Sequence, residues 1–206
     1  MHIAIAGNIG SGKTTLTGLL AKQLKMEAHY ENIEDNPYLF DFYEDMQRWS
    51  FNLQIYFLQN RFRQILEIRK SGKNVIQDRT IYEDAYIFAP NLYNMGLMTT
   101  RDFRNYTELF NLVSEFIKPP DLLIYLRASV PVLVKQIQSR GRGFESGIRL
   151  DYLKKLNERY EDWIDNYDLG KLLVVEVDTC NFIEDQEALG EVINGIQAEL
   201  FGLMSG

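Results

Sequence analysis

The sequence predicts an α/β fold in which helices wind on both faces of a five-stranded parallel sheet, giving three layers. Two observations carry this prediction. Short apolar segments of the kind that form buried parallel strands recur along the chain, and longer segments with helical periodicity separate them. Ligands of such doubly wound sheets bind beyond the carboxyl ends of the strands. The predicted strands cover residues 2–6, 28–31, 73–78, 121–126 and 172–177.

The first predicted strand leads into a glycine-rich loop. Residues 7–14 read GNIGSGKT, which fits the pattern G-x-x-x-x-G-K-S/T, and residues 14–24 carry leucines at helical spacing. Strand, loop and helix together are the context of a P-loop, because backbone N–H groups and the helix N-terminus then face the phosphates. Lys13 would reach the β- and γ-phosphates, and the Thr14 hydroxyl would ligate Mg²⁺. The predicted nucleotide-binding residues are Gly7, Asn8, Ile9, Gly10, Ser11, Gly12, Lys13, Thr14 and Thr15.

The remaining helices follow from apolar spacing and from stop signals. The longest is predicted at about 48–70, where the sequence SGK ends it, and the helix at 101–117 ends before KPP. Strands and helices therefore alternate along the chain. Further helices are predicted near residues 82–95, 130–139, 149–168 and 185–203.

Composition and charge bound the possible partners. The chain has 206 residues, enough for one domain with a full core. Its net charge of −7 does not favour nucleic acid or an anionic membrane surface. Cys180 is the only cysteine, so no disulfide can form within the chain, and no apolar run approaches the ~20 residues that span a bilayer. Because the first strand starts at residue 2, no signal peptide is expected, and we expect a cytoplasmic protein.

Three classes of protein fit a phosphate-binding loop of this kind: a GTPase switch, a motor or other ATPase, and a kinase for a small acceptor. The sequence lacks the N-K-x-D signature that reads guanine, and it gives no sign of the partner surface that motors need. The kinase interpretation requires a base for the acceptor hydroxyl, an acid that binds metal, and cations that meet the charge of the transferring group.

The sequence SRGRGFESG, at residues 139–147, supplies the cations. Arg140 and Arg142 lie in this stretch between two predicted helices and could fold over the phosphates as a lid, which we place at about 139–148. A guanidinium group suits this role because its planar fork binds phosphate oxygens and keeps its charge. The alternative is a solvated basic loop.

The sequence QDRTIYEDAYIF, at residues 77–88, supplies the acid. Asp78 ends a predicted strand and is a candidate for the Mg²⁺ site, and Arg79 could position the acceptor oxygen or a catalytic carboxylate. The alternative for both is a structural ion pair. Asp84 and Phe88 lie one helical turn apart, so they could read and stack a base. The alternative for them is an exposed acid above a core phenylalanine.

Five segments fall in a familiar order over most of residues 1–165. They read GNIGSGKTT, YEN, FYEDMQRWSFNLQIYFLQNRFR, DRTIYEDAYIFAPNLY and RGRGFESGIRLDYLKKLNERYEDWI. Through them the chain resembles the deoxynucleoside kinase family, which includes deoxycytidine, deoxyguanosine and bacterial deoxyadenosine kinases. Many families share the P-loop, whereas D/E-R-S/T-x-Y followed by R-G-R-x-x-E is much more specific.

The resemblance implies roles for the matching positions. Glu31 corresponds to the general base that takes the proton from the nucleoside 5′-hydroxyl, although the residues alone do not favour it over Glu34 or Asp35. Arg79 would contact the 5′ oxygen and Glu31, and Asp78 would assist with Mg²⁺.

The resemblance also implies how the nucleoside is held. Tyr43 and Glu145 match the pair that binds the sugar 3′-hydroxyl, and the tyrosine crowds out a 2′-hydroxyl, which suggests deoxyribose. Gln54 and Arg61 match base-reading positions. They are seven residues apart and lie on one face of the long helix. The alternative for them is a polar stripe on an exposed helix.

Hydrogen-bonding logic then narrows the base. An ionised Asp84 only accepts hydrogen bonds, so it can take one from the amino group of adenine or cytosine and would repel the carbonyl of thymine. Arg61 offers the complementary donors. Because a buried polar group left unpaired discriminates strongly, thymidine is expected to be a poor substrate. This logic leaves deoxyadenosine, deoxyguanosine and deoxycytidine open. The sequence ENIEDNPYLFDFYED, at residues 31–45, resembles bacterial purine-type members of the family, and this resemblance favours deoxyadenosine.

Two lid positions depart from many relatives of this family. Gln136 stands where another arginine is common, and Phe144 where glutamate is common, so the lid holds less charge. Near the C-terminus the sequence DTCNF resembles the loop that lies against the ATP base, which makes Asp178 and Phe182 candidate ATP contacts. An ordinary strand-to-helix turn is the alternative for this segment.

We therefore expect residues 1–206 to form a single deoxynucleoside kinase domain that uses ATP and Mg²⁺. Neither nucleic acid nor a membrane is expected as a partner, and the resemblance implies a homodimer packed through helices. The alternatives are a nucleoside monophosphate kinase such as thymidylate kinase, which needs further cations for the acceptor phosphate, and a non-catalytic nucleotide-binding sensor. The expected catalytic residues are Glu31, Arg79, Lys13, Arg140 and Arg142.

Overall fold

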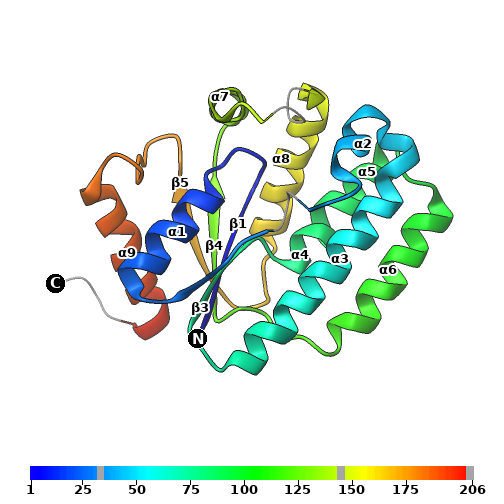
Figure 1. The fold of residues 1–206 in the computed structure, drawn as a ribbon. Coiled ribbons are helices and arrows are strands. Elements are labelled where there is room, and N and C mark those ends of the chain that lie inside the picture. Colours follow the sequence, from blue (N-terminus) through cyan, green and yellow to red (C-terminus); the bar gives the residue numbers. More distant parts are fainter. Residues whose placement is uncertain (32–34, 143–146, 203–206) are drawn as a thin grey trace.

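Five parallel strands form the centre of the computed structural model, which describes residues 1–31, 35–142 and 147–202 (Figure 1). Their order across the sheet is β2-β3-β1-β4-β5. Every neighbouring pair is parallel, so the predicted sheet is confirmed. The strands are β1 (His2–Gly7), β2 (Glu27–His29), β3 (Val75–Asp78), β4 (Leu122–Arg127) and β5 (Lys171–Glu176).

Helices cover both faces of this sheet and give the predicted three layers (Figure 1). The longer ones are α1 (Lys13–Leu24), α3 (Met46–Ser71), α6 (Thr100–Ser114), α7 (Val130–Arg140), α8 (Leu150–Asp165) and α9 (Gln186–Phe201). Helices α1 and α9 pack on one face, whereas α3 and α8 pack on the other. Among the described residues, no helix is long and apolar enough to cross a bilayer.

Side chains of the central strand divide between the two outer layers. Ile3 and Ile5 of β1 pack with α1 and α9, and Ala4 and Ala6 belong to the core on the side of α3 and α8. This alternation is what the two-residue period of a strand requires. The sheet therefore separates two apolar cores and is buried on both faces, as its near-continuous apolar strands predicted.

A ligand crevice lies between the carboxyl ends of β1 and β3. The loop after β1 leads into α1 on one face, whereas the segment after β3 leads into α4 (Ile81–Glu83) on the other (Figure 1). Connections that diverge from neighbouring strand ends open such a crevice. The register of the pair places Asp78 beside Ile5. The end of β3 therefore lies next to the start of the P-loop.

The helical stretch predicted near 82–95 contains a turn of π-helix in the structure. After α4 comes the π-helix η1 (Asp84–Phe88), followed by α5 (Ala89–Asn94). The Ala89 N–H donates to the carbonyl of Asp84, five residues back. Pro90, in the first turn of α5, has no N–H to donate and its ring crowds the preceding turn, which accounts for the wider turn here. The predicted helical stretch is therefore confirmed, and only the π-helical turn within it was not predicted.

A further short helix, α2 (Leu39–Glu44), precedes α3 and was not predicted. Six residues are too few to show helical periodicity. The next helix begins at Met46, two residues before the predicted start, because the Asp45 carboxylate caps it by accepting a hydrogen bond from the Arg48 N–H at 3.0 Å.

Candidate active site

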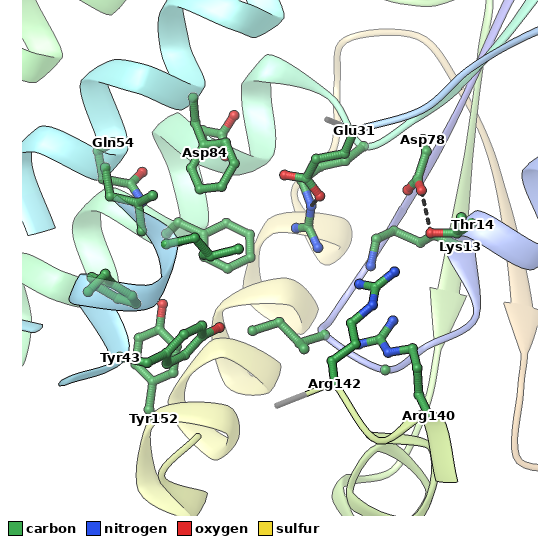
Figure 2. A pocket seen from close by; sticks show the side chains of 18 residues that line it. Lys13, Thr14, Glu31, Tyr43, Gln54, Asp78, Asp84, Arg140, Arg142 and Tyr152 are labelled. Carbon is green, nitrogen blue, oxygen red and sulfur yellow. Dashed lines mark hydrogen bonds and ion pairs between the residues drawn. The ribbon is translucent and has the colours of Figure 1, made fainter. Parts of the chain in front are cut away.

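A pocket with an empty volume of about 720 Å³ opens at the carboxyl edge of β1 and β3 (Figure 2). Its walls come from the P-loop, α2, α3, the segment after β3, the end of α7 and α8. Figure 2 shows Gln54 and Asp84 at one end, Glu31 between, and Lys13 and Thr14 at the other end. The predicted site residues that line it are Ile9, Gly10, Lys13, Thr14, Glu31, Tyr43, Gln54, Asp78, Arg79, Asp84, Phe88, Arg140 and Arg142.

The P-loop has a backbone that needs its glycines. Gly10 (φ 88°) and Gly12 (φ 94°) adopt left-handed conformations, and Gly12 is the N-cap of α1. A Cβ at position 10 would also lie 2.8 Å from the carbonyl oxygen of Leu133 in α7. The loop therefore winds tightly at the N-terminus of α1, where the helix dipole favours an anion. Thr15 follows in the first turn of α1 and is exposed.

Lys13 folds back onto this loop. Its Nζ donates to the carbonyl oxygens of Gly7 at 2.8 Å and Asn8 at 2.9 Å. Burial, together with the positive charge of Arg79, lowers the pKa of Lys13 to about 7. A phosphate group in the loop would favour the ammonium form again, because it would place a negative charge beside Nζ.

Thr14 and Asp78 form the pair predicted for Mg²⁺. The Thr14 hydroxyl donates to Asp78 Oδ2 at 2.6 Å, as the dashed line in Figure 2 marks. Asp78 Oδ1 is buried and has no hydrogen-bond partner within the described part of the chain. A hydroxyl beside an unpartnered carboxylate oxygen suits a hard cation that prefers oxygen ligands and keeps several waters, as Mg²⁺ does. The residues present therefore fit the predicted ion.

Glu31 lies between two arginines. Arg61 Nη2 is 2.6 Å from Glu31 Oε1, and Arg79 Nε is 3.6 Å from Oε2. Burial alone would raise the pKa of Glu31, but the charges of Arg61, Arg79 and Lys13 together outweigh it and hold that pKa below its usual range. Glu31 is therefore ionised at neutral pH, which is the state in which a base accepts a proton.

Arg61 does not line this pocket itself, but it also contacts Asp84 at the far end of the pocket. Its Nε donates to Asp84 Oδ2 at 2.9 Å, so one guanidinium group connects Asp84 with Glu31. Gln54 and Arg61 are only 2% and 3% exposed, which excludes a polar stripe on an exposed helix. Gln54 Oε1 lies buried without a hydrogen-bond partner in the part of the chain that the structure describes. Of the predicted base-reading side chains, Gln54 and Asp84 line one end of the pocket, and Arg61 contacts Asp84 without lining it.

Asp84 and Phe88 both face this interior, so the alternative of an exposed acid is wrong. Asp84 is 2% exposed, and burial raises its pKa to about 6 against the opposing charge of Arg61. The Phe88 ring lines the pocket and lies under the Arg79 guanidinium, whose Cζ is 4.6 Å from the ring centroid.

The sugar-binding pair is placed only in part. Tyr43 lines the pocket from α2, and Tyr152 of α8, which was not predicted, lies beside it in Figure 2. Burial raises the pKa of Tyr152 well above its ordinary value, so its hydroxyl stays neutral. Glu145, the predicted partner of Tyr43, lies outside the described residues.

Both arginines of the predicted lid line the pocket at the end where Lys13 lies. Arg140 is the last residue of α7, and Gly141 ends that helix in a left-handed conformation with φ 64°. Figure 2 shows Arg140 and Arg142 on the same side of the pocket as Lys13. This placement favours the lid interpretation over a solvated basic loop. Residues 143–146 of the predicted lid, which include Phe144, lie outside the described residues.

A second hollow of about 770 Å³ lies on the other side of the P-loop. Gly12, Gln136 and Phe182 line it, and the Phe182 ring would lie 3.3 Å from a Cβ at Gly12. Phe182 lies beside the P-loop and is only 3% exposed, and its contact with the ATP base stays a prediction. Asp178 is engaged elsewhere, because its Oδ1 accepts a hydrogen bond from the Ser129 N–H at 2.9 Å, just before α7.

Two buried residues of the site escaped sequence reasoning besides Tyr152. Glu83 of α4 and Tyr160 of α8 contact Arg79, with Arg79 Nη1 at 3.3 Å from Glu83 Oε1 and 2.7 Å from the Tyr160 hydroxyl. A local signal existed for Glu83, since the sequence TIYE at Thr80 fits a helix capping box. Nothing local marks Tyr160, which lies 81 residues from Arg79.

The fold and the pocket define a class of protein. A P-loop on a parallel sheet, a hydroxyl–carboxylate pair suited to a metal, and a buried acceptor pocket are the parts of a nucleotide-dependent phosphotransferase. The family model described as deoxynucleoside kinase matches residues 3–201, and the chain belongs to this family. The resemblance of the five sequence segments is thereby confirmed.

Known relatives match almost the whole chain. It is 37% identical to the deoxyadenosine/deoxycytidine kinase of Bacillus subtilis, over 94% of this chain and 90% of the relative. It is 39% identical to the deoxyguanosine kinase of Lactobacillus johnsonii, over 96% and 92%. A structure of deoxyadenosine kinase from M. mycoides, with products dCMP and a flexible dCDP bound, has a TM-score of 0.86 at 32% identity and covers 96% of this chain and 100% of that one.

ATP binding at pH 8 is expected to take up a proton, because Lys13 with a pKa of about 7 is mostly neutral there and becomes charged beside a phosphate. Calorimetric titration in two buffers of different ionisation enthalpy measures the uptake, which we expect at roughly one proton per site. Lys13→Arg is the matched control, since arginine stays charged in both states and should remove the uptake. Equal uptake in wild type and control would contradict the lowered pKa.

Proposed function

We propose that the protein transfers the γ-phosphoryl group of ATP to the 5′-hydroxyl of a deoxynucleoside. One observation carries the proposal: Glu31 lies in the pocket between the end at Gln54 and Asp84 and the end at Lys13 and Thr14. A nucleoside whose base contacts the first end would direct its 5′-hydroxyl toward Glu31 and the P-loop. Membership of the deoxynucleoside kinase family supports the same orientation.

Glu31 would take the proton from the 5′-hydroxyl as that oxygen attacks the γ-phosphorus in line with the leaving group. Arg79, 3.6 Å from Glu31 Oε2, would hold the hydroxyl within reach of the carboxylate. Positioning of this kind supplies much of the acceleration in phosphoryl transfer, because the protein has little covalent work to do.

Three sources of positive charge would neutralise the transferring group: Lys13, the two arginines of the predicted lid, and Mg²⁺. Lys13 lies within the P-loop, and Arg140 and Arg142 approach from the end of α7. Fixed cations in a site from which water is excluded stabilise developing charge better than water does. Mg²⁺ held by Thr14 and Asp78 would supply further neutralisation of the β- and γ-phosphates.

The base would be one that carries an amino group. Asp84 is held by Arg61 through Oδ2, and the residue lines the pocket, where a carboxylate accepts a hydrogen bond from an amino group. Gln54 adds a buried acceptor in need of a donor. Relatives named for deoxyadenosine, deoxycytidine and deoxyguanosine support this choice, and we propose deoxyadenosine as the preferred substrate.

Glu31→Gln is expected to lower kcat by roughly a thousandfold or more, because the amide cannot take the proton. ATP affinity should stay within about threefold, since Glu31 lies outside the P-loop. The assay compares four deoxynucleosides and their monophosphates with ATP and Mg²⁺. Phosphorylation of monophosphates alone would indicate a monophosphate kinase. Binding of nucleotides without turnover would indicate a nucleotide sensor. Turnover retained in Glu31→Gln would show that Glu31 is not the base.

Selectivity against thymidine is expected to fall as the pH drops through about 6, where Asp84 gains a proton. A protonated carboxyl can donate to the thymine carbonyl that the carboxylate repels. The measured quantity is the ratio of kcat/KM for deoxyadenosine and thymidine, in which pH effects common to both substrates cancel. Asp84→Asn should lower this ratio roughly tenfold at pH 8 and make it independent of pH. A ratio that keeps its pH dependence in the variant would place base reading elsewhere.

We also propose a homodimer that packs through α6. Leu109 and Leu112 lie on this helix and Phe116 lies two residues beyond its end; they form an apolar stripe at spacings of three and four residues, and they are 39%, 57% and 58% exposed. Helix α6 lies at the outer edge of the molecule, opposite α9 (Figure 1). Burying such a stripe against a second copy of the chain would remove it from water.

Leu112→Asp is expected to shift the protein to monomer in size-exclusion chromatography with light scattering, because a charge would be buried at the interface. Phe201→Asp on α9 is the matched control, since this side chain is 65% exposed and lies on the far side of the molecule. A wild type that is monomeric at tens of micromolar, or a control that dissociates equally, would contradict an interface on α6.

A further inference from the structure

Glu83 is a fully buried carboxylate that the proposed mechanism does not use. The side chain is 0% exposed. Its Oε1 accepts three hydrogen bonds: from the N–H of Gly7 at 3.2 Å, from the Tyr160 hydroxyl at 2.8 Å and from Arg79 Nη1 at 3.3 Å. One oxygen atom therefore joins the start of the P-loop, helix α8 and the arginine that contacts Glu31.

The second oxygen of Glu83 has a different set of partners. Oε2 accepts hydrogen bonds from the Thr80 N–H at 2.7 Å and the Thr80 hydroxyl at 3.3 Å, and the Glu83 N–H donates back to that hydroxyl. This reciprocal arrangement is a capping box that begins α4. Oε2 thus maintains local structure, whereas the contacts of Oε1 lie within the site.

Arg79 needs external support to stay where it is. Its backbone has φ 69°, a left-handed conformation that few non-glycine residues adopt, and its N–H donates to the Ile5 carbonyl at 2.9 Å. The guanidinium group is held by Glu83, by Tyr160 and by the ring of Phe88. With this support it stays 3.6 Å from Glu31 rather than in a close ion pair.

Removing the charge of Glu83 would change this balance. Arg79 is buried, and a buried guanidinium needs a carboxylate partner. Glu31 would then be the carboxylate nearest to Arg79, and a closer pair would occupy the oxygen that has to take the proton. The Gly7 N–H would at the same time lose its acceptor at the first residue of the P-loop.

We propose that Glu83 is a positioning residue, which fixes Arg79 relative to the P-loop and holds it back from Glu31. Tyr160 extends the same frame to α8, because its hydroxyl accepts from Arg79 and donates to Glu83. The inference rests on the proposed phosphoryl transfer, in which Arg79 orients the acceptor hydroxyl and Glu31 takes its proton.

Glu83→Gln tests the proposal, with Thr80→Val as the matched control. Thr80→Val breaks the capping box, whereas the amide oxygen of Glu83→Gln can keep it, and only Glu83→Gln removes the charge beside Arg79. We expect Glu83→Gln to lower kcat roughly thirtyfold or more, with the KM for the deoxynucleoside within about threefold, because misplacement affects the transition state more than binding. Thr80→Val should lose comparable thermal stability and keep kcat within about threefold.

A double-variant cycle separates positioning from loss of structure. In an Arg79→Lys background, Glu83→Gln should lower kcat by no more than about threefold, because its target is already altered. Tyr160→Phe keeps the ring stacked on Tyr125, with centroids 5.8 Å apart, and removes one link to Arg79. Tyr160→Phe should lower kcat roughly five- to tenfold. If Glu83→Gln does not fold, this variant tests the positioning role in its place.

The outcomes are distinct. A wild type that phosphorylates no deoxynucleoside would overturn the proposed function and this inference with it. If the wild type is active, three results would each overturn the positioning role alone. The first is a kcat of Glu83→Gln within about threefold of the wild type, and the second is an equal loss of kcat in Thr80→Val. The third is that the effects of Glu83→Gln and Arg79→Lys on kcat multiply fully in the double variant. If Tyr160→Phe folds and Glu83→Gln does not, a kcat of Tyr160→Phe at the wild-type level would overturn the positioning role.

Discussion

The register between β1 and β3 is the constraint on which the site depends. Parallel pairing sets Asp78 beside Ile5, and the Arg79 N–H continues the ladder to the Ile5 carbonyl. The P-loop leaves β1 two residues later, so its helix brings Thr14 to within 2.6 Å of Asp78 Oδ2. A slip of one residue would turn the carboxylate to the other face of the sheet and separate the two groups. A backbone pairing therefore fixes the relation between phosphate loop and acid.

Burial of several charges in one crevice is tolerated because each has a partner. Glu31, Asp84, Arg61 and Arg79 are linked through Arg61, which bonds to both carboxylates, and through the longer contact between Arg79 and Glu31. An unpaired charge at such depth would be strongly destabilising, so these side chains hold one another in place. The same links hold the pKa of Glu31 below its usual range and connect Glu31 through Arg61 to Asp84, the residue that we propose faces the base. In the proposed reaction, substrate selection and proton transfer would thus share one guanidinium group.

Sequence reasoning succeeded where the signal is local and ran short where it is not. The P-loop follows from eight consecutive residues, and Asp78 follows from its place at a strand end. Glu31 could not be separated from its acidic neighbours without the family resemblance, because its importance comes from Arg61, 30 residues away. Tyr160 was missed for the same reason. The π-helix was not predicted because the effect of Pro90 leaves no periodic pattern in the sequence. Helix α2 was not predicted because six residues are too few to show one.

The lid arginines depend on a glycine in the P-loop. Helix α7 carries Arg140 at its end and packs on the loop so closely that a Cβ at Gly10 would lie 2.8 Å from the Leu133 carbonyl and 2.9 Å from the Ile137 side chain. Any larger residue would push α7 away, and the guanidinium groups with it. Gly10 therefore has two tasks: its left-handed backbone lets the loop turn, and its missing side chain lets α7, with Arg140 at its end, lie close to the P-loop. A motif usually explained by phosphate contact alone thus also sets where the charge of the lid lies.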